Sequence, residues 1–186
     1  MDDCTKRLEE RRISGEQIFD GVVLHVYFDE IALPNNEHAT REYIKHVGAV
    51  CVIPVTDDNK VIMERQYRYP VGRVLYEIPA GKLNSKEEDR LEAAKRELSE
   101  ETGYTADEWI NLGEYLPAAA YSDERITMYM ARGLHKGKQN LDEDEFLDVY
   151  EEDLSKLLSF VMNGTIRDGK TQVAIMKAAN LLGVKE

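Results

Sequence analysis

Four glutamates in one acidic segment, residues 81–104, form the densest group of side chains in the sequence that could do chemistry. They are Glu88, Glu97, Glu100 and Glu101. Ser85 followed three residues later by Glu88 is a capping-box pattern, and Gly103 is a typical helix stop, so we predict a helix at about residues 86–102. On such a helix Glu97 and Glu101 lie one turn apart on the same face, with Glu100 beside them.

These last three carboxylates are electrostatically badly placed. Like charges one turn apart cost roughly a few tenths of a kcal/mol per pair, and the carboxyl end of a helix is already its negative end. Lys95 and Arg96 could offset part of this charge. A solvated helix face is the ordinary reason for a charged run. Carboxylate oxygens are also the ligands that Mg²⁺ and Mn²⁺ prefer, so a divalent metal site is the alternative.

The composition indicates one acidic globular domain. The 186 residues suffice for a full core, and the net charge of −12 with a pI near 4.9 argues against a general affinity for nucleic acid or an anionic membrane. An anionic substrate would therefore depend on local cations. Cys4 and Cys51 offer neither a disulfide framework nor zinc spacing, which favours a reducing cytoplasm. We find no signal peptide and no apolar run long enough to span a membrane.

The hydrophobic pattern predicts an α/β fold with a mixed sheet. Residues 1–14 are charged and are expected to be a frayed end. Residues 19–33 and 39–46 indicate an antiparallel β-hairpin outside the main body. Further strands are predicted at residues 48–55, 61–67, 74–78, 109–115, 126–131 and 146–151, and late helices at residues 153–163 and 170–182. One early acidic helix and two late helices suit a sheet between helical layers, an α/β/α sandwich.

The segment RELSEETGY, from Arg96 to Tyr104, resembles the second half of the Nudix box. Seven residues separate Glu88 from Arg96, as in the box, but six separate Gly81 from Glu88 where the box usually has five. Either the loop carries an extra residue, which costs little, or Glu87 takes the place of Glu88. The resemblance implies the Nudix α/β/α fold, which agrees with the fold expected from the pattern.

Two arginines precede the box on a predicted strand. We expect Arg65 and Arg68 to share one face of that strand, where guanidinium groups suit bidentate contacts with phosphate. Followed by EIPAG at residues 77–81, this pattern is similar to the Nudix enzymes that cleave ADP-ribose and related nucleoside diphosphate sugars. The similarity implies that Arg65, Arg68 and Glu77 bind substrate and that the main-chain carbonyl of Ala80 reaches a metal.

Two loops complete the predicted site. Residues 141–145, LDEDE, hold four acids just before a strand, and an acidic loop over a metal site can provide the base for a water nucleophile. The resemblance implies Glu143 as that base and Glu145 as a metal ligand or helper. The other loop is residues 117–124. The resemblance implies that Glu124 in this loop binds substrate. There Ala118–Ala120 stands where enzymes for ADP-ribose usually have serine, proline and glycine.

Together these features predict a Nudix hydrolase that uses Mg²⁺ or Mn²⁺ to split ADP-ribose into AMP and ribose 5-phosphate. Roughly two or three ions would be held by the Ala80 carbonyl, Glu97, and Glu100 or Glu101. The resemblance also implies a homodimer, so residues 1–43 are expected to form a β extension for dimerisation and residues 44–186 the Nudix domain. The alanine triplet leaves another nucleoside diphosphate sugar, such as GDP-mannose, as a second substrate hypothesis. A non-catalytic ligand sensor of the same fold is the hypothesis from a different class.

Overall fold

The computed structural model describes residues 3–141, 143 and 145–185, and these form two compact units. The first comprises Met1–His46 with Ala118–Glu124, and the second comprises Val47–Pro117 with Arg125–Glu186. We expected a single boundary, after residue 43. The first unit instead takes in a segment from the middle of the chain, which includes the alanine triplet and Glu124.

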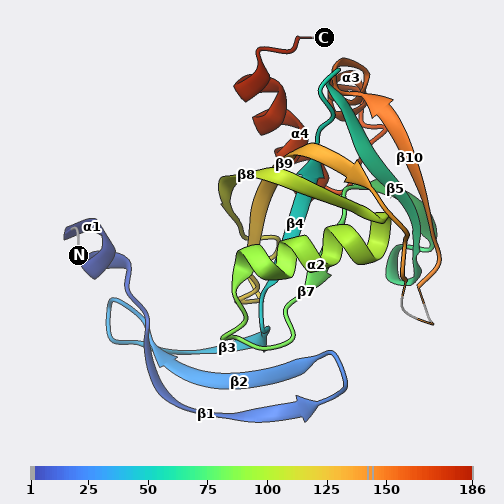
Figure 1. Ribbon diagram of the computed structural model, residues 1–186. Coiled ribbons are helices and arrows are strands. Elements are labelled where there is room, and N and C mark those ends of the chain that lie inside the picture. The colour runs from blue at the N-terminus through green and yellow to red at the C-terminus, as the bar shows by residue number, and fades with distance from the viewer. Residues whose placement is uncertain (1–2, 142, 144, 186) are drawn as a thin grey trace. The chain divides into compact units, whose positions relative to one another are not determined.

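The first unit is built on a three-stranded antiparallel sheet in the order β1 (Arg11–Asp20), β2 (His25–Ala32), β3 (His38–Lys45), after a short helix α1 (Asp3–Leu8) (Figure 1). Strands β2 and β3 are the expected hairpin. The expectation of a frayed end over residues 1–14 is wrong, because Arg11 begins a strand that pairs with β2. The segment 118–124 lies along the end of β3, where the Ile44 amide donates to the Tyr121 carbonyl at 2.9 Å.

The second unit contains two sheets. A four-stranded mixed sheet has the order β7 (Ala80–Lys82), β4 (Ala49–Pro54), β9 (Ile126–Lys136), β8 (Tyr104–Tyr115), with only β4 and β9 parallel. A three-stranded antiparallel sheet has the order β10 (Leu147–Asp153), β5 (Lys60–Arg68), β6 (Arg73–Glu77), and a 3₁₀ turn, η1 (Tyr69–Val71), joins β5 to β6. The helices of this unit are α2 (Arg90–Thr102), α3 (Leu154–Met162) and α4 (Gly169–Leu182).

Strand β4 explains why the mixed sheet lies between helical layers. All of its residues are buried, because alternate side chains enter two different cores. Cys51 and Ile53 pack in a core that includes α3 and α4, whereas Val50 and Val52 pack in a core that includes α2. Figure 1 shows α2 lying across one face of this sheet. The predicted α/β/α sandwich is confirmed.

Helix α2 begins later than the capping-box pattern predicts. Its N-cap is Asp89 rather than Ser85, since Asp89 Oδ1 accepts hydrogen bonds from the amides of Leu91 and Glu92 at 2.9 and 3.0 Å. Gly103 ends the helix in the left-handed conformation, with φ at 75°, as predicted. Residues 86–88 therefore belong to the loop that leads from β7 into the helix.

Strand β7 is a feature that the pattern did not predict. Three residues are too few for an alternation to be recognised, yet they pair with β4 and carry Ala80 and Gly81 at the edge of the mixed sheet. Helix α4 is capped by Asp168, whose Oδ2 atom accepts a hydrogen bond from the Thr171 amide at 3.0 Å.

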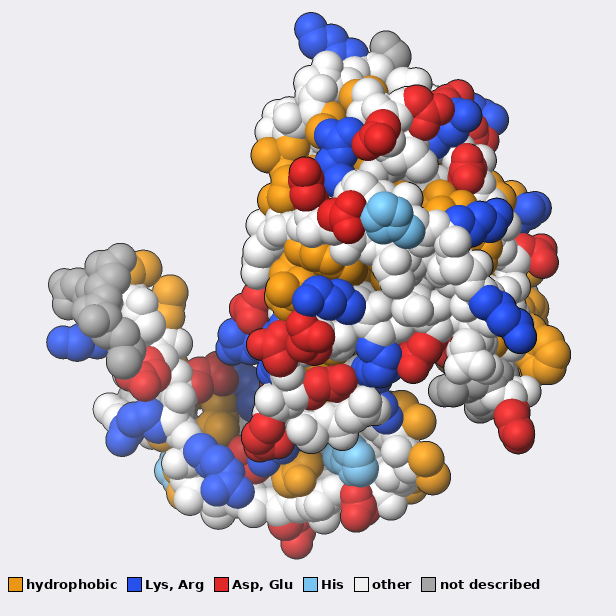
Figure 2. Space-filling view, viewed as in Figure 1, with side chains coloured by type: hydrophobic (Ala, Val, Ile, Leu, Met, Phe, Trp, Pro, Cys, Tyr) orange, Lys and Arg blue, Asp and Glu red, His pale blue; other side chains and the backbone are white. Residues whose placement is uncertain are grey.

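The surface gives two further observations. None of the helices in the described residues is long and apolar enough to cross a membrane. On the face viewed in Figure 2, acidic and basic side chains are intermixed rather than gathered into a continuous basic surface of the kind that binds nucleic acid.

Candidate active site

Arg96 of α2 contacts three of the four predicted glutamates. Arg96 Nη1 donates to Glu97 at 2.7 Å and to Glu100 at 3.1 Å, and the same guanidinium reaches Glu88 at 3.3 Å. Arg96 thus offsets the repulsion that the sequence predicts, whereas Lys95 pairs with Glu92 instead, at 2.7 Å.

The carboxylates of α2 lie directly on the backbone of β7. A Cβ atom added to Gly81 would be 2.0 Å from Glu97 Cδ, so only glycine allows this approach. The Ala80 amide donates to Glu101 Oε2 at 2.9 Å. Both Glu97 and Glu101 are buried. The structure therefore brings the predicted Ala80 main chain and two predicted metal-binding glutamates to one place.

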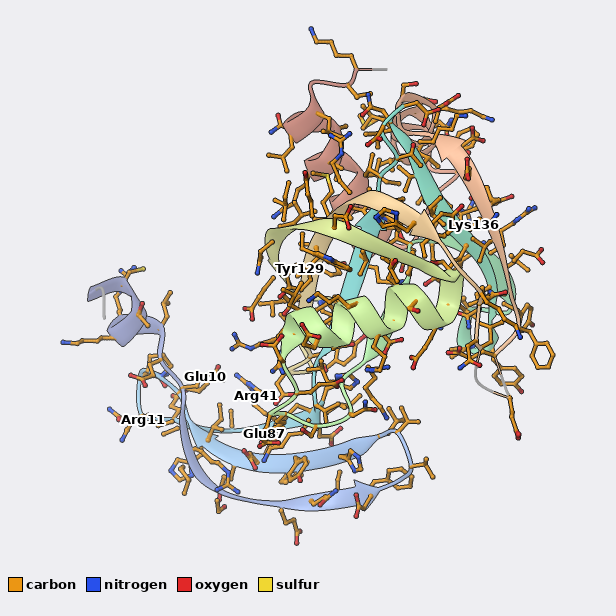
Figure 3. All side chains as sticks on the ribbon, in the orientation of Figure 1. Glu10, Arg11, Arg41, Glu87, Tyr129 and Lys136 are labelled. Carbon is orange, nitrogen blue, oxygen red and sulfur yellow. The ribbon has the colours of Figure 1, made fainter. Side chains whose placement is uncertain are left out.

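The extra residue before the helix does not displace Glu88. Glu88 Oε2 accepts a hydrogen bond from the Asn84 amide at 2.5 Å, and its other oxygen faces Arg96. Glu87, labelled in Figure 3, is exposed on the loop before α2. Glu88 is therefore the acid that joins the cluster, and it orders the loop that supports the last turn of α2.

Beneath the cluster Glu77 anchors a buried ion-pair network. Arg68 donates from Nε and Nη2 to the two Glu77 carboxylate oxygens, each at 2.8 Å. Lys170 also donates to Glu77 and lies 3.0 Å from Asp168 Oδ2. Although burial raises the pKa of Glu77, the bonds from Arg68 and the charge of Lys170 together hold it below the ordinary value. Lys170 was not recognised from the sequence, because its partner Glu77 lies 93 residues away along the chain.

The expectation that Arg65 and Arg68 share a face is wrong. They are three residues apart, an odd number, and side chains alternate along a strand. Arg65 lies 4.8 Å from the ring centroid of Tyr150 on β10. It lines a hollow of about 630 Å³ together with Tyr67, Tyr76 and Glu145, among others, while Arg68 faces Glu77. Only Arg68 therefore belongs to the buried network below the glutamates.

Glu64 is a site residue that sequence reasoning missed. It lies on β5 directly opposite Glu77 of β6, its side chain is buried, and its Oε1 atom has no hydrogen-bond partner. Burial, and then the charge of Glu77, raise the pKa of Glu64. Burial, and then the charges of Glu64 and Glu97, raise the pKa of Glu101. The available signal was an acid two residues after Ile62, on the same face of a strand with a buried core side.

The acidic loop is tied to the end of α2. Gln139 Nε2 donates to the Glu101 carbonyl at 2.6 Å, and the Asn140 amide donates to the Glu100 carbonyl at 3.0 Å. Glu145 follows and is half-buried, and its charge adds to the effects of burial that raise the pKa of Glu64, Glu97 and Glu101. The charge of Glu145 thus acts on the cluster, and its side chain lines the hollow beside Arg65.

The other loop residues are placed less closely. Glu143 is exposed on the acidic loop, and Asp142 and Asp144 lie outside the described residues. Glu124 belongs to the first unit, where its carboxylate is 3.8 Å from His46 Nδ1 and its amide donates to Ser122 Oγ at 3.1 Å.

The donor set fits a divalent cation. Carboxylates and a main-chain carbonyl are the hard oxygen ligands that Mg²⁺ selects, and buried carboxylates need a compensating positive charge. Glu64 Oε1 is buried and has no hydrogen-bond partner, so the cationic side chains of the protein do not pair with every buried carboxylate oxygen. In the described part of the chain, no group of three or more histidine, cysteine or acidic side chains has the geometry of a metal site. Ion binding would therefore require the glutamates to reorient.

An α/β/α sandwich with buried glutamates packed on a glycine-containing edge strand defines this protein as an α/β protein with a buried cluster of carboxylates. The family description "NUDIX domain" matches residues 45–168, and the chain belongs to the Nudix family. It is 43% identical over 172 residues to an ADP-ribose pyrophosphatase of Bacillus subtilis (strain 168), which covers 91% of this chain and 92% of that protein.

Two further comparisons agree with the family. A protein of Bacillus methanolicus described as a methanol dehydrogenase activator is 43% identical over 173 residues, covering 91% of this chain and 92% of that protein. A solved structure described as that of an ADP compounds hydrolase has a TM-score of 0.82 at 20% identity and covers 94% of this chain and 95% of its own. The family and the fold predicted from the sequence are thereby confirmed.

Proposed function

We propose that this protein hydrolyses the diphosphate bond of ADP-ribose with Mg²⁺ or Mn²⁺, releasing AMP and ribose 5-phosphate. The observation that carries the proposal is the burial of Glu97 and Glu101 on the Ala80–Gly81 backbone, with Glu145 alongside. The similarity to an ADP-ribose pyrophosphatase over nine-tenths of both chains supports the substrate.

The cation site is assigned to the cluster at the end of α2. Glu97, Glu101 and the carbonyl of Ala80 would hold the ions, with Glu100 at the exposed edge. When bound, a divalent ion supplies positive charge opposite the diphosphate, which this acidic protein otherwise provides only through a few side chains. Arg96 donates hydrogen bonds to the carboxylates of Glu97 and Glu100. These hydrogen bonds would have to break for the two carboxylates to bind an ion.

The chain's own residues carry the remaining steps. Arg68 is positioned by Glu77, and its bonds to Glu77 use Nε and Nη2, which leaves Nη1 to meet a phosphate oxygen. Glu143 accepts a proton from the attacking water as its oxygen bonds to phosphorus. The bridging P–O bond then breaks, and its electron pair leaves with the other phosphate. Glu145 helps to hold the cation. The substrate contacts expected of Arg65 and Glu124 remain predictions.

We further propose a homodimer formed through the N-terminal sheet of residues 11–45, as expected from the sequence. All ten residues of β1 are exposed, and its apolar side chains, Ile13, Ile18 and Phe19, are each about half exposed. A strand that buries none of its side chains against its own chain gains little hydrophobic stabilisation unless a partner covers it. The cytoplasmic location expected from the cysteines stays a prediction.

The experiment is a substrate panel with purified protein and Mg²⁺. The panel contains ADP-ribose, GDP-mannose, NADH, diadenosine polyphosphates and nucleoside triphosphates, and product release is followed by chromatography. We expect ADP-ribose to be turned over most efficiently. Preference for GDP-mannose would support the second substrate hypothesis, and tight binding of one compound without turnover would support the sensor.

The metal role is tested by Glu101→Gln. We expect this variant to lose activity by at least about a hundredfold while keeping its fold, because an amide replaces a carboxylate ligand. Circular dichroism and the unfolding transition check the fold. Glu108→Gln on β8 removes an exposed carboxylate outside the cluster and is the matched control. Wild-type turnover by Glu101→Gln would remove the assigned role.

A further inference from the structure

Glu64 stands out as a carboxylate whose burial nothing in its strand explains. Only 2% of the residue is exposed, and Oε1 is buried without a hydrogen-bond partner. The residues before it on β5, Val61, Ile62 and Met63, are all buried and apolar. A buried ionised carboxylate without a partner is costly and persists where another charge compensates it.

The neighbours of Glu64 add negative charge. Glu77 is its direct cross-strand partner, and like charges at this position repel. Glu101 and Glu145 are also close enough for their charges and that of Glu64 to act on one another. The nearby cations are engaged elsewhere, since Arg68 and Lys170 both donate to Glu77. Among the described side chains, the nearby cations that could neutralise Glu64 therefore already form hydrogen bonds with Glu77.

We propose that Glu64 is a further ligand of the divalent cation, reaching the site from strand β5 opposite the glutamates of α2. The inference rests on the cation site of the proposed function and adds a carboxylate that lies outside the Nudix box. One divalent ion between Glu64 and Glu101 would compensate two buried carboxylates at once. It would also satisfy the unpartnered Oε1 atom, which a hydrogen bond within the chain does not.

The test measures metal binding in the absence of substrate. Metal-free wild-type protein, Glu64→Gln and Glu92→Gln are titrated with Mn²⁺, by calorimetry and by loss of the free-ion signal in electron paramagnetic resonance. Glu92 is an exposed carboxylate in the first turn of α2 and pairs with Lys95, so its variant removes the same charge away from the site. We expect Glu64→Gln to weaken Mn²⁺ binding by about tenfold or more and Glu92→Gln by no more than about twofold.

A stability measurement separates a ligand from a structural residue. Without metal, Glu64→Gln should unfold at the same temperature as wild type or a higher one, because it removes a buried carboxyl group whose Oε1 atom has no hydrogen-bond partner. The rise in Tm on adding Mn²⁺ should be smaller than in wild type, because ligand binding stabilises by mass action. A structural role would instead lower the Tm of the metal-free variant and leave the Mn²⁺ shift unchanged.

The outcomes also separate this inference from the proposed function. Wild-type affinity for Mn²⁺ in Glu64→Gln overturns the inference even when ADP-ribose is hydrolysed. Loss of Mn²⁺ binding in that variant supports it even when wild type does not hydrolyse ADP-ribose, in which case the substrate assignment alone fails. A wild-type protein that binds no Mn²⁺ overturns the inference and the metal part of the proposed function together.

Discussion

Glu77 shows how one buried charge positions the arginine Arg68. Its carboxylate is held from one side by Arg68 and from the other by Lys170, whose own side chain is only 10% exposed. Removing one partner of a buried ion pair leaves the other charge uncompensated, which costs far more than losing an exposed pair. The Lys170 ammonium therefore stabilises the fold and keeps Glu77 ionised and able to hold Arg68.

We expect Lys170→Met to reduce the free energy of unfolding by about 3–5 kcal/mol, measured by urea denaturation. The control is Lys156→Met, which removes an ion pair with Glu152 from an exposed lysine whose side chain is 52% exposed. That change should cost less than about 1 kcal/mol. Equal losses in the two variants would contradict the buried role of Lys170.

The residues that could be predicted are those whose neighbours lie close in the sequence. Glu97, Glu100 and Glu101 are placed by helical spacing alone, and Arg96 lies within the same turn. Glu64 and Lys170 reach the site through strand pairing and helix packing, which a local pattern does not contain. Both residues are buried and both lie next to Glu77, which is 13 positions from Glu64 and 93 positions from Lys170 along the chain.

At the scale of the element, two candidate caps compete for the start of α2. Ser85 has the right spacing from Glu88 for a capping box, but Asp89 lies closer to the apolar positions of the helix. In the structure Asp89 receives two amide hydrogen bonds, whereas Ser85 Oγ receives one, from Glu87, within the loop. The carboxylate is also the better group beside the positive end of a helix dipole.

Replacing Asp89 with alanine should therefore reduce stability by about 1 kcal/mol, seen as a fall in Tm of roughly 2–4 °C. Ser85→Ala is the matched control and should change Tm by less than about 1 °C, because its hydrogen bond lies in an exposed loop outside the helix. A larger effect for Ser85→Ala would mean that the capping box operates in solution.

Strongly patterned elements were predicted well, and elements without a hydrophobic pattern of their own were not. The apolar run of β4 and the periodic helices α3 and α4 lie within a residue or two of their expected positions. Strand β7 has only three residues and is defined by its pairing with β4. Strand β1 alternates poorly because none of its residues is buried, so no apolar face marks it in the sequence.

At the scale of the whole molecule, the segment 118–124 shows what local patterns leave out. It leaves β8 in the second unit and returns to β9, yet it pairs with the end of β3 through the backbone of Ile44 and Asp123. The loop that carries the alanine triplet therefore belongs to the N-terminal unit. Its assignment depends on backbone contacts between residues more than 75 positions apart, Ile44 with Tyr121 and Asp123, and no motif in the loop encodes them.

The exposed strand β1 leads to the prediction about assembly. We expect wild type to sediment as a dimer and Phe19→Asp as a monomer at micromolar concentration. A symmetric interface uses Phe19 twice, and each buried Phe side chain contributes about 1.5 kcal/mol or more, so dissociation should be favoured by roughly a hundredfold or more. Phe19 is 56% exposed in the single chain, which leaves that much of it to be covered by a partner.

Analytical ultracentrifugation over a range of concentrations decides the matter, with Leu181→Asp as the control. Leu181 is 55% exposed, like Phe19, but lies near the end of α4 in the second unit. Because the two variants introduce the same charge at equally exposed apolar positions, only the location differs. Dissociation by Phe19→Asp alone places the interface on the N-terminal sheet. Dissociation by Leu181→Asp alone would move it to the second unit, and a monomeric wild type would leave β1 without the partner that its exposed side chains require.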